Sequence, residues 1–489
     1  MIRSSDPNSE SDPAAGSGAG SGGAAGGAAG SVADRTGPDV HSRSLGELHS
    51  SVAVPSEKAG FWRQYRAFFG PALLVSVGYM DPGNWSTDLG AGAVYKYALL
   101  WVVGLASGMA ILLQVCSSRL GVVMGKDLAQ ACRDHYPAWT RWPNWIFCEL
   151  AIAACDLAEV LGSAVALNLL FHIPLPWAVA MTAFDVLLLL ALQGFGMRMI
   201  EAVIVVLIGT IAVCYYLEIF VLPQTAPSFL EMGRAMLSPS LRNEDMRYLA
   251  IGIIGATVMP HNLYLHSALV QSRQLQSNDS SIRRAIKFNT LDSVVALTVA
   301  FLVNAAILVL AAMVFYGHDA KTLVAGTNID EGDWIRIAYQ TLSPLLGAAA
   351  ASVLFAVALF ASGQSSTITG TLAGQVVMEG FMHWRIRPWL RRLITRSLAV
   401  CPAVVIVILR PQAKINDLLN LSQAFLALQL PLAMFPLMHF TSSRKHMGKY
   451  RIGWFLLSAG WICCVLITVL DLYGLPGTVR EAWKVVSGN

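Results

Sequence analysis

Long apolar stretches recur along most of this chain, and they constrain its fold more than any other feature. Each stretch reaches roughly 18 residues or more, which is enough to cross a bilayer as a helix. Inside hydrocarbon, only helices and closed barrels satisfy all their backbone groups. The stretches are continuous rather than alternating, which favours helices. Charged residues make up 13% of the chain, against roughly 25% in soluble domains. We therefore predict an all-α polytopic membrane protein.

About eleven stretches are predicted to span the membrane. Their approximate limits are 66–92, 97–122, 144–171, 174–194, 198–221, 247–271, 287–316, 343–372, 391–409, 416–440 and 452–473. Residues 1–58 are rich in Gly, Ala, Ser and Pro and hold few large apolar residues, so they cannot bury enough surface to fold. We predict a disordered cytoplasmic tail at 1–58 and a transmembrane transport domain at 59–489.

The distribution of Lys and Arg predicts the orientation of the chain. The loops after even-numbered spans hold 17 of these residues, and the opposite loops hold 7. Because basic loops stay in the cytoplasm, we expect a cytoplasmic N-terminus and an external C-terminus, in a plasma membrane or bacterial inner membrane. The net charge is only +4, and no basic patch with interleaved aromatic residues appears. The expected partners therefore include the lipid bilayer but no nucleic acid, and no obligate protein partner is evident.

Two predicted spans are broken near their middle by a proline between polar residues. The first carries Asp-Pro-Gly-Asn at 81–84, and the sixth carries Met-Pro-His-Asn at 259–262. Proline removes a backbone donor and clashes with the preceding turn. Paired broken helices in two halves of a chain indicate a transporter site, and an offset of five spans inverts the second half. We predict inverted repeats at about 66–221 and 247–440, with an extra helix at about 452–473.

The side chains at these breaks indicate which substrate they bind. Asp81 supplies an anionic oxygen, Asn84 a neutral oxygen and Met259 a soft sulfur, and the second proline frees the carbonyl of Ala256. Thioether sulfur favours transition metals, whereas Mg²⁺ and Ca²⁺ prefer oxygen ligands alone. The sequence therefore predicts a site for divalent transition metals. Gln423, in the tenth span, either completes the metal shell or faces neighbouring helices.

Three carboxylates in the third span are candidates for carrying protons. Glu149, Asp156 and Glu159 are seven and three residues apart, so they share one face of a helix. Ionisable residues within a membrane are costly and therefore indicate a functional site. A proton relay is one interpretation. The alternative is a structural ion pair with arginines at the start of the ninth span, namely Arg391, Arg392 or Arg396.

Both broken motifs resemble the signatures of the Nramp family (natural resistance-associated macrophage proteins). The stretch at 259–273 is similar to that family over its whole length, and so is the stretch at 363–381. The resemblance covers about residues 65–473 and leaves out the N-terminal tail. It implies a LeuT-like fold and proton-coupled transport of divalent metals. Met259 argues against the magnesium-transporting relatives, which lack this methionine.

The resemblance also implies roles for individual residues. The implied metal ligands are Asp81, Asn84, Met259 and the carbonyl of Ala256. The implied proton route passes through Asp156 and Glu159, with His261 near the metal. We therefore expect a secondary active importer of Mn²⁺, Fe²⁺ and related ions that is not an enzyme and has no cofactor, since the metal is its substrate and H⁺ the coupling ion. The alternatives are a transporter of Mg²⁺ or of a sodium-coupled solute on the same fold, or an intramembrane metalloenzyme.

Overall fold

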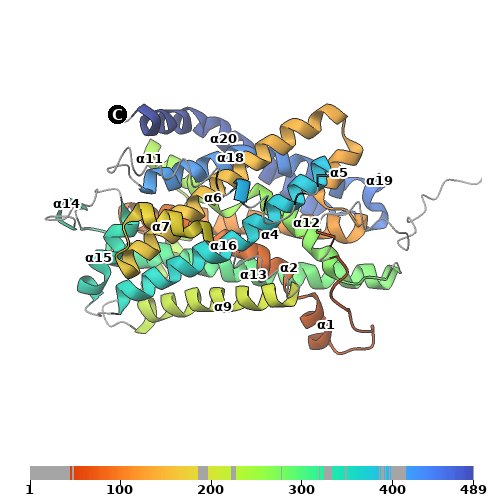
Figure 1. Cartoon of the computed structure of the whole chain (residues 1–489), viewed down its shortest axis with the longest axis horizontal. Helices are drawn as coiled ribbons and strands as arrows, with labels where there is room; N and C mark the ends of the chain where they lie inside the picture. The colour runs from red at the N-terminus through yellow and green to blue at the C-terminus, as the bar shows by residue number, and fades with distance from the viewer. Residues whose placement is uncertain are drawn as a thin grey trace, which may run out of the picture. The chain divides into compact units, whose positions relative to one another are not determined.

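The computed structural model describes residues 45–46, 49–184, 197–221, 227–276, 278–318, 320–323, 333–346, 350–384, 386, 390, 393–395, 397 and 415–487. Within these residues the fold is helical, and the β-structure consists of an isolated bridge between Val52 and Arg273. The prediction of an all-α polytopic fold is confirmed, and Figure 1 shows the helices.

The longest helices correspond to predicted spans. They are α4 (Leu100–Met124), α6 (Arg141–Phe171), α9 (Met197–Tyr216, extended by a π-helical turn at Leu217–Val221), α13 (Asp279–Val314), α16 (Ala351–Met382), α18 (Ile415–Ser442) and α20 (Trp454–Ser487). Counting α11 with α12 as one span, eight helices in the described part are long and apolar enough to cross a membrane. Most of the predicted span at 391–409 and the end of the span at 174–194 lie outside the described residues.

Shorter helices form the broken spans and the connections. They are α1 (Phe61–Phe68), α2 (Pro71–Ser76), α3 (Pro82–Tyr95), α5 (Leu128–His135), α7 (Leu175–Met181), α10 (Phe229–Leu237), α11 (Glu244–Thr257), α12 (Pro260–Leu269), α14 (Ala320–Leu323), α15 (Trp334–Leu346) and α19 (Arg444–Met447). Both predicted breaks are present. The first lies between α2 and α3, and the second lies between α11 and α12.

Each break places an extended residue directly before a proline. A 3₁₀ turn at Val77–Met80 follows α2, and Asp81 is then extended, with φ −68° and ψ 165°. Met259 is extended in the same way, with φ −80° and ψ 125°. Pro82 and Pro260 occupy the first position of the next helix, where the missing N–H costs nothing and the fixed φ suits the helix. The prolines therefore start new half-helices rather than kinking continuous ones.

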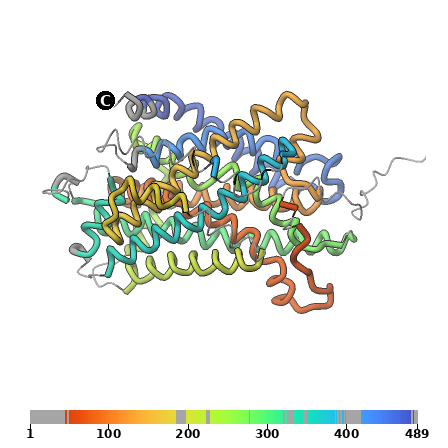
Figure 2. Tube along the Cα trace, in the orientation of Figure 1, coloured from red at the N-terminus to blue at the C-terminus, as the bar shows by residue number. Residues whose placement is uncertain are grey.

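Close helix contacts surround the two breaks. α6 packs along α16, and Figure 2 shows their traces side by side. A Cβ on Gly162 of α6 would come within 2.3 Å of the Pro82 ring, so this glycine allows α6 to approach the first break closely. α18 packs against α6, α11 and α20. The breaks are therefore enclosed by helices from both halves of the chain.

The end of the predicted tail is structured and packs on the helical body. Ser50 and Val52 donate backbone hydrogen bonds to Gln271 and Ser272, at 3.1 and 2.9 Å. The N–H of Gln274 donates to the carbonyl of Val52 at 2.9 Å, and the Val52 side chain is buried. The predicted disordered tail extends to residue 58, because residues 1–58 are rich in Gly, Ala, Ser and Pro and hold few large apolar residues. Its backbone groups and a few buried apolar side chains hold it in place.

Candidate metal-binding site at the two helix breaks

Asp81 and Asn84 form the core of the candidate site at the first break. Both side chains are buried. Asp81 caps α3, because its Oδ1 accepts the backbone N–H of Asn84 at 3.0 Å. The same oxygen accepts the side-chain amide of Asn84 at 2.9 Å. The second oxygen, Oδ2, has no hydrogen-bond partner among the described residues. A buried carboxylate oxygen without a donor is costly, so this oxygen is available to a cation.

The second break contributes a backbone carbonyl to the same point. The Asn84 amide nitrogen also donates to the carbonyl oxygen of Ala256 at 3.0 Å. That carbonyl lies four residues before Pro260, which has no N–H to offer it. Two acceptors from two different half-helices, Asp81 Oδ1 and Ala256 O, therefore converge on one nitrogen atom. The side-chain oxygen of Asn84 accepts hydrogen bonds from Thr257 at 3.2 Å and Asn304 at 3.4 Å.

Met259 is fully buried in the extended segment of the second break. Its sulfur accepts a weak hydrogen bond from the side-chain amide of Asn262, with an N···S distance of 3.6 Å. Its side chain packs in a small apolar cluster with Cys155 of α6 and Leu426 of α18. The thioether therefore lies between α12, α6 and α18. Of these helices, α6 also carries the candidate proton carriers.

Gln423 of α18 lies beside the first break. A Cβ on Gly83 would come within 1.9 Å of Nε2 of Gln423 and 2.9 Å of Oδ2 of Asp81. The amide and the free carboxylate oxygen therefore approach the same point over Gly83. Oε1 of Gln423 is buried and has no hydrogen-bond partner in the part of the chain that the structure describes. This placement suits the interpretation in which Gln423 faces the site.

The carboxylates of α6 face α16. Asp156 and Glu159 are both buried, and a Cβ on Gly370 would lie 3.6 Å from Asp156 Oδ1 and 3.1 Å from Glu159 Oε1. Glu159 Oε1 accepts a hydrogen bond from the Ser366 hydroxyl at 2.8 Å. It also accepts a weaker one from the Cys155 thiol at 3.6 Å. Cys155 packs against Met259, so it connects the candidate ligand to the candidate proton carrier.

The other predicted proton-pathway residues fall into three groups. His261 lies in the first turn of α12 and is buried, and its Nδ1 makes no hydrogen bond with any described residue. Glu149 is half-buried further along α6 and accepts a hydrogen bond from Trp145 at 3.2 Å. Arg391 and Arg392 lie outside the described residues.

Sequence reasoning missed several polar partners of the site. Ser366 lies within the 363–381 stretch, for which no site role was predicted, and Asn304 is one of two amide side chains within the apolar helix α13. Asn304 donates to the carbonyl of Tyr79 at 2.7 Å, so it satisfies a carbonyl in the turn before Asp81. Both Ser366 and Asn304 are polar residues in the middle of an apolar span, and this position is the sequence feature that could have indicated a role near the site.

A buried polar cluster holds the segment that leads into the first break. Arg273 donates to the C-terminal carbonyls of α1 and to Glu201 of α9, the latter at 2.9 Å. Arg198 donates to the other oxygen of Glu201 at 2.8 Å. Asp292 of α13 accepts the backbone N–H of Gly70 at 3.3 Å. This cluster fixes the start of α2, which leads to Asp81, against α9, α12 and α13.

Sequence comparisons point to one family. The family model described as "Natural resistance-associated macrophage protein-like" (Nramp) matches residues 72–476. A "Divalent metal cation transporter MntH" from Nostoc sp. is 49% identical over 436 residues, which cover 89% of this chain and 96% of that protein. A protein of the same name from Mesorhizobium japonicum is 48% identical over 437 residues, with coverage of 89% and 94%.

Solved structures similar to this chain include a metal transporter, in agreement with the sequence comparisons. The Eremococcus coleocola manganese transporter, solved with an aromatic bis-isothiourea substituted compound, superposes with a TM-score of 0.81 at 40% identity. The match covers 89% of this chain and 91% of that one. Mhp1, a nucleobase-cation-symport-1 family transporter, matches with a TM-score of 0.52 at 12% identity, over 90% of this chain and 96% of that chain. This second likeness concerns the fold alone.

Proposed function

This chain belongs to the Nramp family, and from that premise we propose how it binds divalent metals and couples their import to protons. It is an integral membrane transporter of divalent metal cations with a LeuT-like fold, and it is not an enzyme. The metal is its substrate rather than a cofactor. The residues that bind the metal, the proton route and the orientation in the membrane are the subjects of the proposal.

The convergence of two acceptors on the Asn84 amide carries the proposed metal site. Asp81 Oδ1 and Ala256 O lie 2.9 and 3.0 Å from that nitrogen, and they come from the two broken helices. In this arrangement the amide hydrogens occupy the position that a cation would take. A divalent ion would displace them, and the amide would turn to present its oxygen as a third ligand. Oδ2 of Asp81, which has no described partner, would face the ion as well.

Met259 and Gln423 would complete the metal shell. The sulfur lies in the extended segment directly before α12, and the Gln423 amide lies over Gly83 next to Asp81. Among the described residues, no group of three or more His, Cys, Asp or Glu side chains is placed to hold a metal ion. The proposed site therefore relies on one carboxylate with neutral donors, and one charge favours release of the ion as well as binding.

Asp156 and Glu159 are the proposed proton carriers. They lie on the α6 face that packs against α16, and Cys155 connects this face to Met259. His261 is the proposed proton acceptor near the metal, and its buried Nδ1, which has no described hydrogen-bond partner, supports this role. A cation at Asp81 would favour deprotonation of groups nearby by charge repulsion. Metal binding and proton release would be coupled in this way.

The proposed orientation places the N-terminus in the cytoplasm and the C-terminus outside. The excess of Lys and Arg in alternate loops supports it. Arg198, at the start of α9, and Arg273, after α12, are two of these basic residues, and they lie at the same end of the structure as α1, because both bind its carbonyls. Metal would then enter from the side opposite α1.

Uptake into sealed liposomes tests the proposal. The full chain is reconstituted with a pH-sensitive dye inside, and Mn²⁺ uptake and internal pH are recorded together. We expect Mn²⁺ uptake with internal acidification in the wild type, and uptake without acidification in Asp156→Asn. Mn²⁺ uptake without acidification in the wild type would reject proton coupling. Unchanged acidification in the variant would reject Asp156 as a proton carrier.

A further inference from the structure

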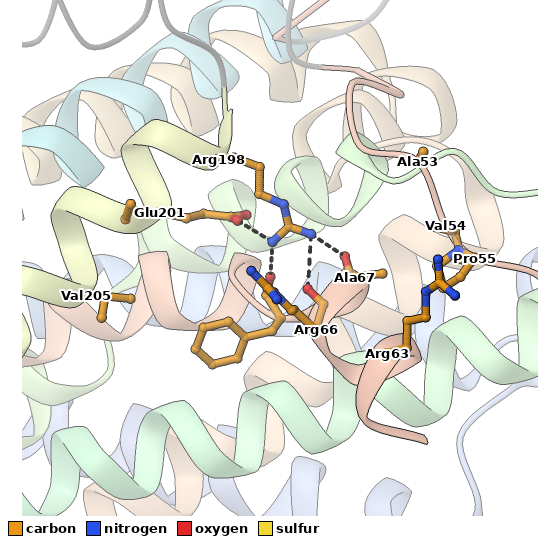
Figure 3. Close-up of a pocket in the computed structure, with 11 residues that line it drawn as sticks. Ala53, Val54, Pro55, Arg63, Arg66, Ala67, Arg198, Glu201 and Val205 are labelled. Atoms are coloured by element: carbon orange, nitrogen blue, oxygen red, sulfur yellow. Dashed lines mark hydrogen bonds and ion pairs between the residues drawn. The ribbon is translucent and has the colours of Figure 1, made fainter. Parts of the chain in front are cut away.

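An open cavity of about 740 Å³ lies where α1 meets the first turns of α9. Residues Ala53–Pro55 of the docked N-terminal segment line one side, and Arg63 and Arg66 of α1 line another. Ala202 and Val205 of α9 form its apolar wall. Figure 3 shows Arg63 extending beside Pro55, with Arg66 below Arg198. The cavity is separate from the helix breaks and has no role in the proposed metal or proton paths.

The arginines around this cavity are of two kinds. Arg198 is fully engaged, because it donates to Glu201 and to the carbonyls of Arg66, Ala67 and Phe69 at 2.8 to 3.1 Å. The side chains of Arg63 and Arg66 make no hydrogen bond or ion pair with any described residue, and both are exposed. The only carboxylate that lines the cavity within the described part, Glu201, is already paired with two arginines. The cavity therefore presents two cations available to an anion.

The residues around the cavity indicate its depth in the membrane. α9 begins an apolar span at Met197, and its outer face is exposed, with Val205 46% and Val206 66% accessible. On α1, Phe61 and Trp62 are 47% and 76% exposed. Aromatic residues on a short helix beside basic residues are typical of the membrane–water interface. The two arginines thus lie at headgroup level, and the apolar wall continues towards the acyl chains.

We propose that this cavity binds an anionic phospholipid. The phosphate lies between Arg63 and Arg66, because guanidinium groups pair with phosphate through charge-assisted hydrogen bonds. The first part of an acyl chain lies along Ala202 and Val205. Basic pockets between membrane helices bind anionic headgroups by the same combination of charge and apolar contact. A soluble phosphate would leave the apolar wall exposed, so the geometry favours a lipid.

Such a lipid contacts three parts of the chain that meet at the first broken span. The headgroup touches the docked N-terminal segment, α1 and α9, and the carbonyls at the end of α1 are held by Arg198 and Arg273. α1 leads through Gly70 into α2 and then to Asp81. The bound lipid therefore stabilises the contact of this segment with α9. The site does not depend on which metal is transported.

Native mass spectrometry of the full chain in detergent tests the proposal. Phosphatidylglycerol and phosphatidylcholine of identical acyl chains are titrated against the wild type, Arg63→Gln/Arg66→Gln and Val205→Trp, which fills the cavity without changing its charge. We expect the wild type to retain phosphatidylglycerol preferentially. We expect binding about 25-fold weaker in the double variant, since each of two basic residues near an anionic surface contributes roughly fivefold. Val205→Trp should also lose the preference for phosphatidylglycerol over phosphatidylcholine.

Arg444→Gln/Arg451→Gln is the matched control. It removes two exposed arginines that do not line the cavity and should leave lipid retention unchanged. Mn²⁺ binding by calorimetry verifies that each variant is folded. Equal retention of both lipids by the wild type overturns the proposal, as does an equal loss in the control. Retention of phosphatidylglycerol by Val205→Trp excludes the cavity. Displacement of the lipid by millimolar inorganic phosphate shows a free-anion site instead.

Discussion

The carboxylate of Asp81 and the side-chain amide of Asn84 are joined by a 2.9 Å hydrogen bond across the first turn of α3. Only Oδ1 takes part in this bond, and the buried Oδ2 has no described hydrogen-bond partner. The same amide bonds to Ala256 from the other broken helix. The pair therefore joins the two half-helices through a group that a cation can replace. This relationship predicts that the charge of Asp81 matters more than its shape.

Asp81→Asn keeps the shape of the side chain and removes its charge. We expect the protein to remain folded, because the amide oxygen can still accept the Asn84 N–H that caps α3. Mn²⁺ binding should weaken at least about 30-fold, since removing one partner of a buried charge pair costs about 2–5 kcal/mol. Calorimetry in detergent measures the affinity, and liposome uptake measures transport. Uptake near the wild-type rate would show that the metal binds elsewhere.

Gly83→Ala tests the placement of Gln423 beside Asp81. The new Cβ would come within 1.9 Å of the Gln423 amide nitrogen and 2.9 Å of Asp81 Oδ2, so the amide must move away from the site, and Gln423→Ala isolates its contribution from that of Asp81. We expect Mn²⁺ affinity to fall about 10-fold or more, as for the loss of a supporting partner of a metal site. The Mn²⁺ affinity of Gln423→Ala should fall by a similar factor. Gly108→Ala is the control, because nothing lies within 4 Å of its Cβ. Wild-type affinity in Gly83→Ala would place Gln423 outside the site.

Ser366→Ala separates proton coupling from metal binding. The Ser366 hydroxyl donates to Glu159 at 2.8 Å and holds the carboxylate in its orientation. Without it we expect less acidification per Mn²⁺ taken up and Mn²⁺ affinity within about twofold of wild type, because Ser366 is a positioning residue rather than a proposed ligand. Ser365→Ala is the matched control, since that hydroxyl donates to its own helix at Ser362. An equal loss in both variants, or a large fall in Mn²⁺ affinity, would assign Ser366 a structural role instead.

The helix breaks could be predicted because local chemistry determines them. A proline cannot donate a hydrogen bond in any environment, and a polar residue beside it in an apolar span has few roles other than ligand binding. The prediction of a helix break at each of the two proline motifs therefore needed no knowledge of the tertiary fold. The face shared by Asp156 and Glu159 followed from helical periodicity alone.

The partners of those residues could not be predicted, because they come from distant parts of the sequence. Ser366 meets Glu159 only when α16 packs on α6, and Asn304 reaches the first break only from α13. Serine and asparagine are also common in spans without any such role. The order of the tail segment around Val52 could not be predicted for a related reason. Its backbone forms hydrogen bonds with Gln271–Gln274, and the composition of the tail does not indicate that these residues lie beside it.

Removing one partner of the buried Arg273–Glu201 ion pair should destabilise the protein strongly. The Arg273 side chain is fully buried and that of Glu201 is 5% exposed. Glu201→Ala would leave a buried arginine without its counter-charge, at a cost of about 3–5 kcal/mol. Glu231→Ala removes the exposed pair with Lys96 and should cost less than about 1 kcal/mol. Thermal unfolding in detergent compares the two variants. Equal melting temperatures for Glu201→Ala and Glu231→Ala would show that the buried ion pair of Glu201 with Arg273 matters no more for stability than an exposed pair.

Met259 provides the sharpest test of how the site selects its substrate. The thioether lies in the extended segment before α12 and packs against Cys155 and Leu426. In one interpretation it binds the metal, and in the other it only fills space among these apolar neighbours. The two interpretations differ in their consequences for hard cations. A packing residue would affect all metals equally, whereas a sulfur ligand would affect each metal according to its softness.

Met259→Ala removes the sulfur and leaves space for a water molecule, which supplies an oxygen ligand at the same position. Mg²⁺ and Ca²⁺ prefer oxygen and gain little from sulfur, whereas softer ions such as Cd²⁺ gain most. We therefore expect the variant to retain some Mn²⁺ uptake, to lose most of its preference for Cd²⁺ and to begin admitting Mg²⁺ or Ca²⁺. Competition of each ion against Mn²⁺ uptake measures this in wild type and variant. Leu426→Ala, which opens the same apolar cluster without removing sulfur, is the control. If Mg²⁺ and Ca²⁺ compete no better in Met259→Ala than in wild type, the methionine is a packing residue, and selectivity arises elsewhere in the site.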